Sequence, residues 1–399
     1  MRLKLMLPRV NVEEYVVLTA CPGGSCGGTR FKLMQKVTKR LRDTALREVV
    51  ARRYRCVRCG QTFRVYPSGV SRDQCSARLK GVAVLLYVLG LSYGAVALAL
   101  QALGHPFGKT AVYNAVQAAG ERVPGLRRSA IELPKAAGQV PAIGADLTSV
   151  KCRGKWLSVG VSVDAISGIA LTVDLLDDGE AETLTKWLEE IAAAVGAEVV
   201  VTDDADGFKQ AADETGLEHQ VCKSHVVRNT EEWIEQAKPG LAADADRSLA
   251  EIAVMPEQAL ADCEELLRLM RDRARAPGSR ASGEATLAAI HRRYAQAAAP
   301  KRGAEEKTSL AYRLRLFTLD RWNLWGRLTL YRTWKDSQGR ALDGTNNVTE
   351  RVIGWWVKER YRTMRGYKRE RSVLNVSRLI AWAGGQLTTG GADLATVIA

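Results

Sequence analysis

AIGADLTSV (142–150), KWLSVGVSVD (155–164) and GIALTVDLL (168–176) are the three stretches that decide the fold of this 399-residue chain. Apolar residues alternate with small or polar residues in each of them, which is typical of strands that bury one face. The tight turn Ala165–Gly168 joins the second stretch to the third. We therefore expect three antiparallel strands that lie side by side, with Asp146 in the middle of the first.

The segments that follow extend this sheet. AETLTKWLEEIAAAVG (181–196) reads as a helix, and AEVVVTDD (197–204) is an apolar strand that ends in acid. A helix at 206–216 and a short strand and turn at 217–225 come next. Three antiparallel strands, a helix and a buried strand ending in aspartate follow the order of the ribonuclease H-like fold. The sequence thus predicts a multidomain α/β protein with a ribonuclease H-like catalytic core, built on a mixed five-stranded sheet with helices.

A change of composition divides this core into two parts. Residues 142–228 would form the first part. Residues 229–342 are rich in Ala, Leu, Arg and Glu and almost lack strand signals, so we expect an all-helical insertion. Residues 343–384 would supply the final, helical part of the core. The tail 385–399 contains no motif from which a role follows.

The positive charge is concentrated near the N-terminus. Residues 1–142 contain 23 Lys and Arg against 7 Asp and Glu, so the rest has 35 against 37, within a net charge of +14. A basic module joined to a nearly neutral body favours a polyanion such as nucleic acid as the partner, although a solubilising surface is the simpler alternative.

Four cysteines in two close pairs predict a metal site within residues 1–70. Cys21 and Cys26 form the first pair, and Cys56 and Cys59 the second, in a CxxCG knuckle. Four thiolates suit tetrahedral Zn²⁺, and binding would supply much of the folding energy of so small a module. We predict a zinc ribbon that holds one structural Zn²⁺. Four unrelated cysteines are the alternative.

Residues 71–125 read as a helix-turn-helix domain. Helices are expected at 77–89, 93–103 and 109–123, and Ser92 can cap the start of the second. The third would be a recognition helix in the DNA major groove, although a plain helical bundle between domains is the alternative. Its predicted DNA-binding residues are Lys109, Thr110, Tyr113 and Asn114. Residues 126–141 read as a linker.

The sequence gives no sign of membrane attachment. The apolar stretch Val82–Leu103 is broken by Gly90, Ser92 and Gly94, whereas a spanning helix needs about 20 unbroken apolar residues. The N-terminus lacks the pattern of a signal peptide. We expect no membrane contact and a cytoplasmic protein.

Several motifs together resemble one family. They are Asp146 in GADLTSV, Asp203 in VVVTDDADGF, the pair Cys222 and His225 in HQVCKSHVVRN, and Glu350 in TNNVTER, which precedes a basic run and RGY. Over nearly its whole length the chain resembles bacterial insertion-sequence DDE transposases of the Mutator-like kind. The resemblance implies that Asp146, Asp203 and Glu350 are the catalytic triad. Asp204 is adjacent, but we favour Asp203 because it directly follows the apolar strand.

The resemblance also implies cofactors and partners. Two Mg²⁺ or Mn²⁺ ions held by the three acids would promote DNA cleavage and strand transfer, since carboxylate oxygens are their preferred ligands. The partners would be double-stranded DNA, both the terminal inverted repeats and the target, and a second copy of the chain in a homodimer that synapses two ends. A nucleoid-associated position in the cytoplasm follows.

Other residues near the triad admit two interpretations. Cys222 and His225 are a family signature of unknown role; they could bind metal, although packing or orientation of the helix is the simpler reading. Trp322, Trp325 and Trp334 could stack on an unpaired base, or anchor the helical segment. A basic run is expected to contact DNA phosphates. Its predicted DNA-binding members are Arg351, Lys358, Arg360, Arg362 and Arg365.

Two other classes of protein fit part of this pattern. One is a DNA-binding regulator, a zinc ribbon and helix-turn-helix derived from an inactive transposase. The other is a structure-selective nuclease with a ribonuclease H-like fold, which cuts DNA without joining it. The inverted-repeat sequence, the target preference, the choice between excision and copying, and the oligomeric state are open at this level.

Overall fold

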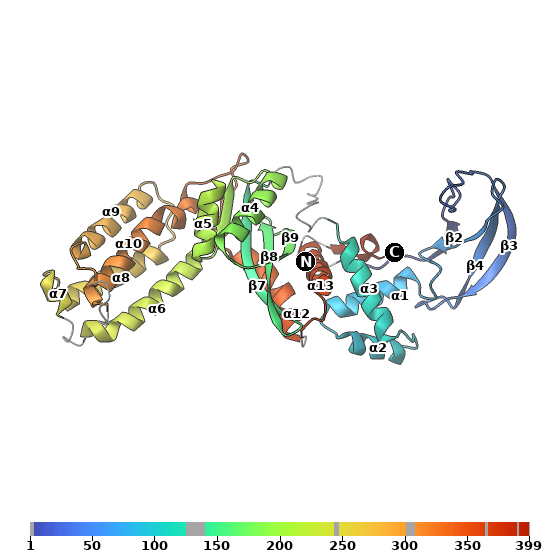
Figure 1. The fold of residues 1–399 in the computed structure, drawn as a ribbon, viewed down its shortest axis with the longest axis horizontal. Coiled ribbons are helices and arrows are strands. Elements are labelled where there is room, and N and C mark those ends of the chain that lie inside the picture. Colours follow the sequence, from blue (N-terminus) through green and yellow to red (C-terminus); the bar gives the residue numbers. More distant parts are fainter. Residues whose placement is uncertain are drawn as a thin grey trace.

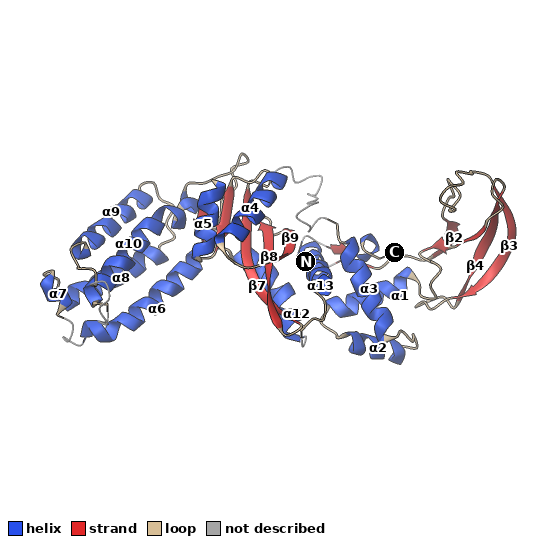
Figure 2. Ribbon diagram, in the orientation of Figure 1, coloured by secondary structure: helices blue, strands red, loops and turns tan. Residues whose placement is uncertain are grey.

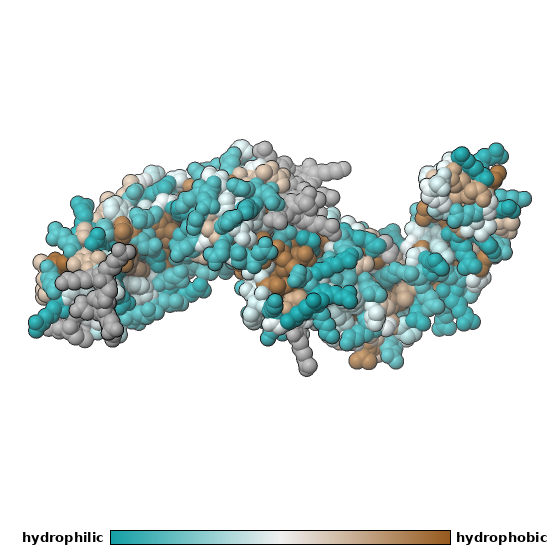
Figure 3. All heavy atoms as spheres, in the orientation of Figure 1, coloured by the Kyte–Doolittle hydropathy of each residue, from teal (hydrophilic) through white to brown (hydrophobic). Residues whose placement is uncertain are grey.

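The computed structural model describes residues 4–124, 140–242, 247–300, 308–363, 366–388 and 391–398. The molecule is elongated, with helices α6 to α10 at one end and the sheet of β3 and β4 at the other (Figure 1). A central sheet and helices α1 to α3 and α13 lie between them (Figure 2). Hydrophilic side chains prevail on the face seen in Figure 3, and apolar residues form small patches there.

The central sheet has five strands and is mixed, as the sequence predicts. Its order is β11-β10-β7-β8-β9. The three strands β7, β8 and β9 are antiparallel neighbours, whereas β10 runs parallel to both β7 and β11. The strands are β7 (Ala142–Cys152), β8 (Lys155–Asp164), β9 (Ala170–Leu176), β10 (Val199–Thr202) and β11 (Glu218–Val221).

Helices cover both faces of this sheet. Helices α4 (Ala181–Val195) and α5 (Asp206–Thr215) bury one face, where Trp187 is fully enclosed. Apolar side chains of α13 (Glu370–Thr388) pack with alternate valines of β8 on the other face. Because the sheet is covered on both sides, small polar residues at the alternate positions, such as Ser162 and Thr172, are buried as well, so the strands do not bury one face alone.

Three short helices occupy the region of the predicted helix-turn-helix: α1 (Ala77–Val88), α2 (Tyr93–Ala102) and α3 (Lys109–Arg122). Ser92 Oγ caps α2 by accepting a hydrogen bond from the Ala95 amide, as expected. These helices share one apolar core with α13, and a side chain at Gly120 would collide with the backbone of Asn375. They are therefore part of the central body. Within the described residues, no helix is long and apolar enough to cross a membrane.

A helical segment with its own apolar core follows the sheet. It projects to one side of the sheet in Figure 1. Inside it, the buried carboxylate of Asp262 accepts hydrogen bonds from Arg293 and from the hydroxyl of Tyr294. The segment comprises α6 (Lys223–Ala242), α7 (Ser248–Glu251), α8 (Pro256–Arg271), α9 (Ser279–Tyr294), α10 (Leu310–Leu328) and the 3₁₀ turn η1 (Leu330–Arg332).

The N-terminal region is built from strands. The basic stretches between the two cysteine pairs form β3 (Phe31–Arg40) and β4 (Glu48–Cys56), which pair with β5 (Thr62–Val65). The short strands β2 (Asn11–Tyr15) and β6 (Pro67–Ser68) make a second small sheet.

The C-terminal tail, which showed no motif, contributes β12 (Gly391–Asp393) and the turn η3 (Leu394–Thr396). β12 pairs in parallel with β1 (Lys4–Met6), which brings the two ends of the chain together. Residues 125–139, which hold most of the predicted linker 126–141, lie outside the described residues.

Candidate active site and nucleic-acid interface

Asp146 lies on β7, and Asp203 directly follows the end of the neighbouring parallel strand β10. Val201 on β10 pairs with Gly144 on β7, and each aspartate is two residues further along its chain. Burial raises the pKa of Asp146 to about 7, and the negative charge of Asp203 contributes to the same shift. Glu350 adds a smaller effect in the same direction, while Lys358 opposes it. Two acids that repel each other in this way form a site suited to a cation.

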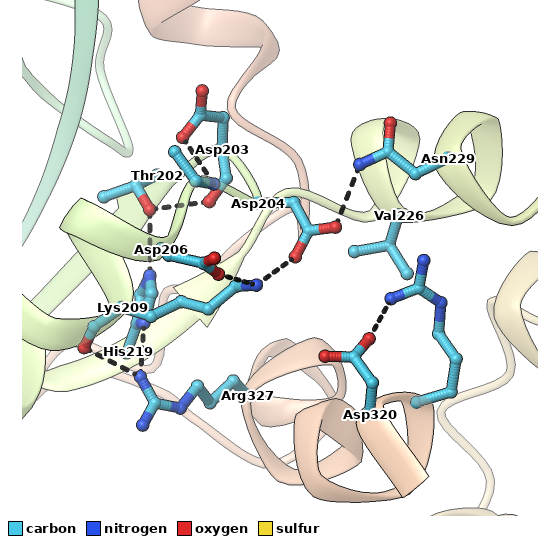
Figure 4. Close-up of polar contacts among 12 residues, drawn as sticks. Thr202, Asp203, Asp204, Asp206, Lys209, His219, Val226, Asn229, Asp320 and Arg327 are labelled. Carbon is cyan, nitrogen blue, oxygen red and sulfur yellow. Dashed lines mark hydrogen bonds and ion pairs between the residues drawn. The ribbon is translucent and has the colours of Figure 1, made fainter. Parts of the chain in front are cut away.

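The adjacent acids Asp203 and Asp204 have different surroundings (Figure 4). Asp204 is nearly buried; its carboxylate lies 3.0 Å from Lys209 Nζ and accepts a hydrogen bond of 3.0 Å from Asn229 Nδ2. The side chain of Asp203 points away from Lys209 and Asn229, and its carboxylate accepts a hydrogen bond from the Ala205 amide. Asp204 thus has the contacts of a structural residue, whereas the charge of Asp203 contributes to the raised pKa of Asp146.

The TNN motif attaches Glu350 to the strand of Asp146. Asn346 Nδ2 donates a hydrogen bond of 3.0 Å to the Ala145 carbonyl. A side chain on Gly144 would come within 2.2 Å of Thr349 Oγ1, so the glycine permits this close approach. Glu350 lies on the short helix α11 (Asn347–Arg351), in agreement with the helical structure expected for this part of the core. The π-helical segment η2 (Val352–Lys358) and α12 (Glu359–Thr363) continue it.

The carboxylate of Glu350 lies beside Cys222 and His225 at the start of α6. Its Oε1 is 3.8 Å from Cys222 Sγ and 3.4 Å from His225 Nδ1. Cys222, which is fully buried, also accepts a hydrogen bond of 3.2 Å from the Asn346 amide. Among the described residues, these three form a group whose ligand atoms all lie within 4.8 Å of one another; Asp146 and Asp203 are not in it.

The four predicted zinc ligands are brought together. Cys21 Sγ is 3.8 Å from Cys59 Sγ, and Cys26 Sγ is 3.7 Å from Cys56 Sγ. Tetrahedral zinc with Zn–S distances near 2.3 Å requires sulfurs about 3.8 Å apart. The four thiols influence one another: a backbone hydrogen bond from Cys59 is the main cause that lowers the pKa of Cys56 to about 7, whereas the hydrogen bond with the Cys59 thiol raises the pKa of Cys26.

The residues proposed for the recognition helix differ in their exposure. Lys109, Thr110 and Asn114 are exposed on α3. Tyr113 is half-buried: its hydroxyl is 3.0 Å from Ser372 Oγ, and its ring packs edge-on against Tyr93. These contacts turn part of the Tyr113 side chain toward α13 and α2, and its contact with DNA stays a prediction.

The basic run also separates into surface and structural residues. Arg351, Lys358 and Arg362 are exposed. Arg360 is buried, donates hydrogen bonds to the carbonyls of Gly90 and Leu91, and stacks on Tyr87 at 3.8 Å. The guanidinium thus holds the turn between α1 and α2, which gives Arg360 a structural role, and its contact with DNA stays a prediction. Arg365 lies outside the described residues.

A groove beside β7 has features of a nucleic-acid surface. Its volume is about 640 Å³, and it is lined by residues 147–151 of β7, by Trp156, and by Lys358, Tyr361, Arg362 and Gly366. Trp156 is 70% exposed, which is unusual for so large an apolar side chain. Sequence reasoning overlooked it because it stands in an otherwise ordinary strand.

The tryptophans singled out in the sequence are packed. Trp325 is fully buried and donates a hydrogen bond to the Arg280 carbonyl. Trp322 and Trp334 are partly buried against apolar neighbours. The interpretation that they anchor the helical segment is the one that the structure favours.

Asp146 on β7, Asp203 just past the end of β10 and the exposed basic side chains of η2 and α12 form a candidate site of the kind expected in enzymes that process nucleic acids. The family described as Transposase IS66 family matches residues 75–363, which is well over half of the chain. The chain belongs to the IS66 transposase family. The predicted resemblance to insertion-sequence transposases is confirmed, but the Mutator-like assignment within them is wrong. No curated protein sequence matches the chain.

Proposed function

We propose that this transposase binds the terminal inverted repeats of an insertion sequence and cuts and joins DNA at a site formed by Asp146, Asp203 and Glu350. The alignment of β7 with β10 supports the proposal most directly, because it sets two of the acids side by side. Asn346 of the TNN motif then attaches the helix that carries Glu350 to β7 through its hydrogen bond to the Ala145 carbonyl. The sheet order agrees with a ribonuclease H-like core, interrupted by the helical segment between β11 and α11 as an insertion.

The donor set fits divalent cations. Burial and the charge of Asp203 disfavour ionisation of Asp146, and a bound cation relieves both effects. Asp146, Asp203 and Glu350 would hold two Mg²⁺ or Mn²⁺ ions. Such ions, when bound, activate the attacking oxygen and stabilise the leaving oxygen of a phosphodiester.

Residues around the acids would place the DNA strand. Lys358 and Arg362 line the groove beside β7 and can neutralise phosphates next to the scissile bond. Trp156 offers an exposed ring on which an unpaired base can stack. Arg351, exposed on α11, would add a further phosphate contact. The strand would therefore run along β7 toward Asp146.

Recognition of the transposon end is assigned to the N-terminal third. Residues 1–70 would form a zinc ribbon around Cys21, Cys26, Cys56 and Cys59, and residues 71–125 a helix-turn-helix. Lys109, Thr110 and Asn114 are exposed for contact with DNA. Because α1 to α3 share their core with α13, binding should be measured on the full chain. Pairing of two ends implies a homodimer in the synaptic complex.

The experiment incubates the full chain with a labelled transposon end and Mg²⁺. Metal-dependent cleavage at the end, followed by joining to a target, supports the proposal. Binding without cleavage would instead indicate a regulator derived from an inactive transposase. Cleavage that depends on DNA structure and never yields joined product would indicate a nuclease.

A further inference from the structure

We infer that Cys222, His225 and Glu350 form a second transition-metal site, which takes a Zn²⁺ ion and shares Glu350 with the proposed catalytic centre. The three side chains come from two elements far apart in the sequence, the start of α6 and the helix α11. Their ligand atoms lie within 4.8 Å of one another. Nitrogen, sulfur and oxygen donors in this combination suit zinc and not magnesium, which prefers oxygen alone.

The distances between the donor atoms match tetrahedral zinc. With Zn–S near 2.3 Å and Zn–N and Zn–O near 2.1 Å, the sulfur and oxygen would lie about 3.6 Å apart and the nitrogen and oxygen about 3.4 Å apart. The observed distances from Glu350 Oε1 are 3.8 Å to Cys222 Sγ and 3.4 Å to His225 Nδ1. Both distances from Glu350 Oε1 thus fit a bound ion, the third pair of donor atoms lies within 4.8 Å, and three protein ligands leave a fourth position open.

The surroundings of the cluster point to a ligand as well. His225 Nδ1 is buried and makes no hydrogen bond within the described part of the chain, so the atom that faces Glu350 is unsatisfied. A buried polar atom without a partner is costly, and a bound cation would satisfy it. The Asn346 amide donates to Cys222 Sγ, the type of second contact that orients a metal-binding thiolate.

Zinc at this position would have a consequence that rests on the proposed function. Glu350 belongs both to the zinc cluster and to the proposed triad, so zinc bound at its Oε1 would compete with the magnesium site for this carboxylate. Zinc would therefore withdraw the third acid from the magnesium site. The expected result is inhibition of cleavage by zinc while Mg²⁺ is in excess.

The test of binding counts zinc ions on the full chain after dialysis against zinc. The wild type should hold two ions, one of them in the N-terminal cysteine cluster. Cys222→Ser and His225→Asn should each hold one, while Cys263→Ser, which alters a buried thiol remote from both clusters, should keep two. Two ions on both Cys222→Ser and His225→Asn would overturn the site. Should Cys222→Ser fail to fold, His225→Asn decides, because His225 is partly exposed.

Cleavage assays test the shared carboxylate separately. In Mg²⁺, the zinc concentration that halves cleavage should rise at least about tenfold in His225→Asn, each protein being compared with its own zinc-free rate. Equal inhibition of both proteins would overturn the withdrawal of Glu350. If the wild type never cleaves in Mg²⁺, the proposed function fails, whereas the zinc count still tests the second site.

Discussion

Asn346 holds the carbonyl of Ala145 through a hydrogen bond of 3.0 Å, and so joins the TNN motif to the residue just before Asp146. The two segments are about 200 positions apart in the sequence. Thr349 lies against Gly144 at the same contact. The position of Glu350 relative to Asp146 therefore depends on a few atoms of close packing.

Gly144→Ala should disturb this contact. The new methyl group would lie 2.2 Å from Thr349 Oγ1 and 3.0 Å from Val163, so α11 must shift. Overpacking of this kind typically costs about 1–3 kcal/mol. We expect a lower unfolding temperature and a larger loss of cleavage than of end-binding. Gly385→Ala, where the space is open, is the matched control and should retain both activities. Normal cleavage by Gly144→Ala would argue against the contact.

Much of the sheet could be predicted because strand alternation and the turn at Gly168 are local signals. The cap of Ser92 on α2 could be predicted for the same reason. Contacts between distant elements could not: Arg360 looks like its exposed neighbours in the sequence, and only the turn carbonyls of Gly90 and Leu91 show that it is structural. The pairing of β12 with β1 joins two ends that carry no motif.

The candidate site was predictable to a similar degree. An acid at the end of an apolar strand indicated Asp203 or Asp204, but the preference between them depends on Lys209 and Asn229, which come from other elements. The proximity of Glu350 to Cys222 is likewise a product of tertiary packing. Spacing along the chain carries no information on either contact.

Replacement of the three acids should separate chemistry from binding. Asp146→Asn, Asp203→Asn and Glu350→Gln nearly preserve shape but remove a metal-binding charge, so each should abolish cleavage and strand transfer. End-binding, measured by gel shift, should be nearly unchanged. If all three variants cleave normally, the transposase mechanism proposed here fails.

Asp204→Asn is the control that resolves the adjacent acids. It removes the charge paired with Lys209, and loss of a hydrogen-bonded charge typically costs about 1.5–3 kcal/mol. We expect reduced thermal stability with substantial cleavage by the folded protein. An inactive Asp204→Asn together with an active Asp203→Asn would move the assignment by one residue.

Lys358→Ala should weaken DNA binding, whereas Arg360→Ala should lower the stability of the fold. Lys358 is exposed in the groove, so its loss should weaken DNA binding and reduce the log–log salt slope by about 0.9 for one phosphate contact. The unfolding temperature of Lys358→Ala should not change.

Arg360→Ala leaves two turn carbonyls without a donor and should destabilise the protein by about 2–4 kcal/mol. Reversed effects would show that Arg360 is the residue that contacts DNA.

Cys59→Ser should remove zinc from the N-terminal cluster. With three thiolates left, the strands β3, β4 and β5 should lose order, and proteolysis should cut within residues 1–68 while the central body persists. Cys75→Ser, outside the cluster, is the matched control. Full zinc occupancy of the cluster in Cys59→Ser would show that the ligand set is wrong.

The raised pKa of Asp146 predicts how stability depends on pH without divalent cations. The folded chain binds this proton up to about pH 7, whereas a free aspartate releases it near pH 3.8. Between these values the folded state binds more protons than the unfolded state, so the free energy of unfolding should fall as pH rises from about 4 to 7. Asp146→Asn, measured by thermal unfolding, should lose this component and be more stable than the wild type at pH 8.

Because a cation relieves the repulsion between Asp146 and Asp203, Mg²⁺ should stabilise the wild type at pH 8 and have little effect on Asp146→Asn. Equal stabilisation of both proteins by Mg²⁺ would mean that the ion binds elsewhere.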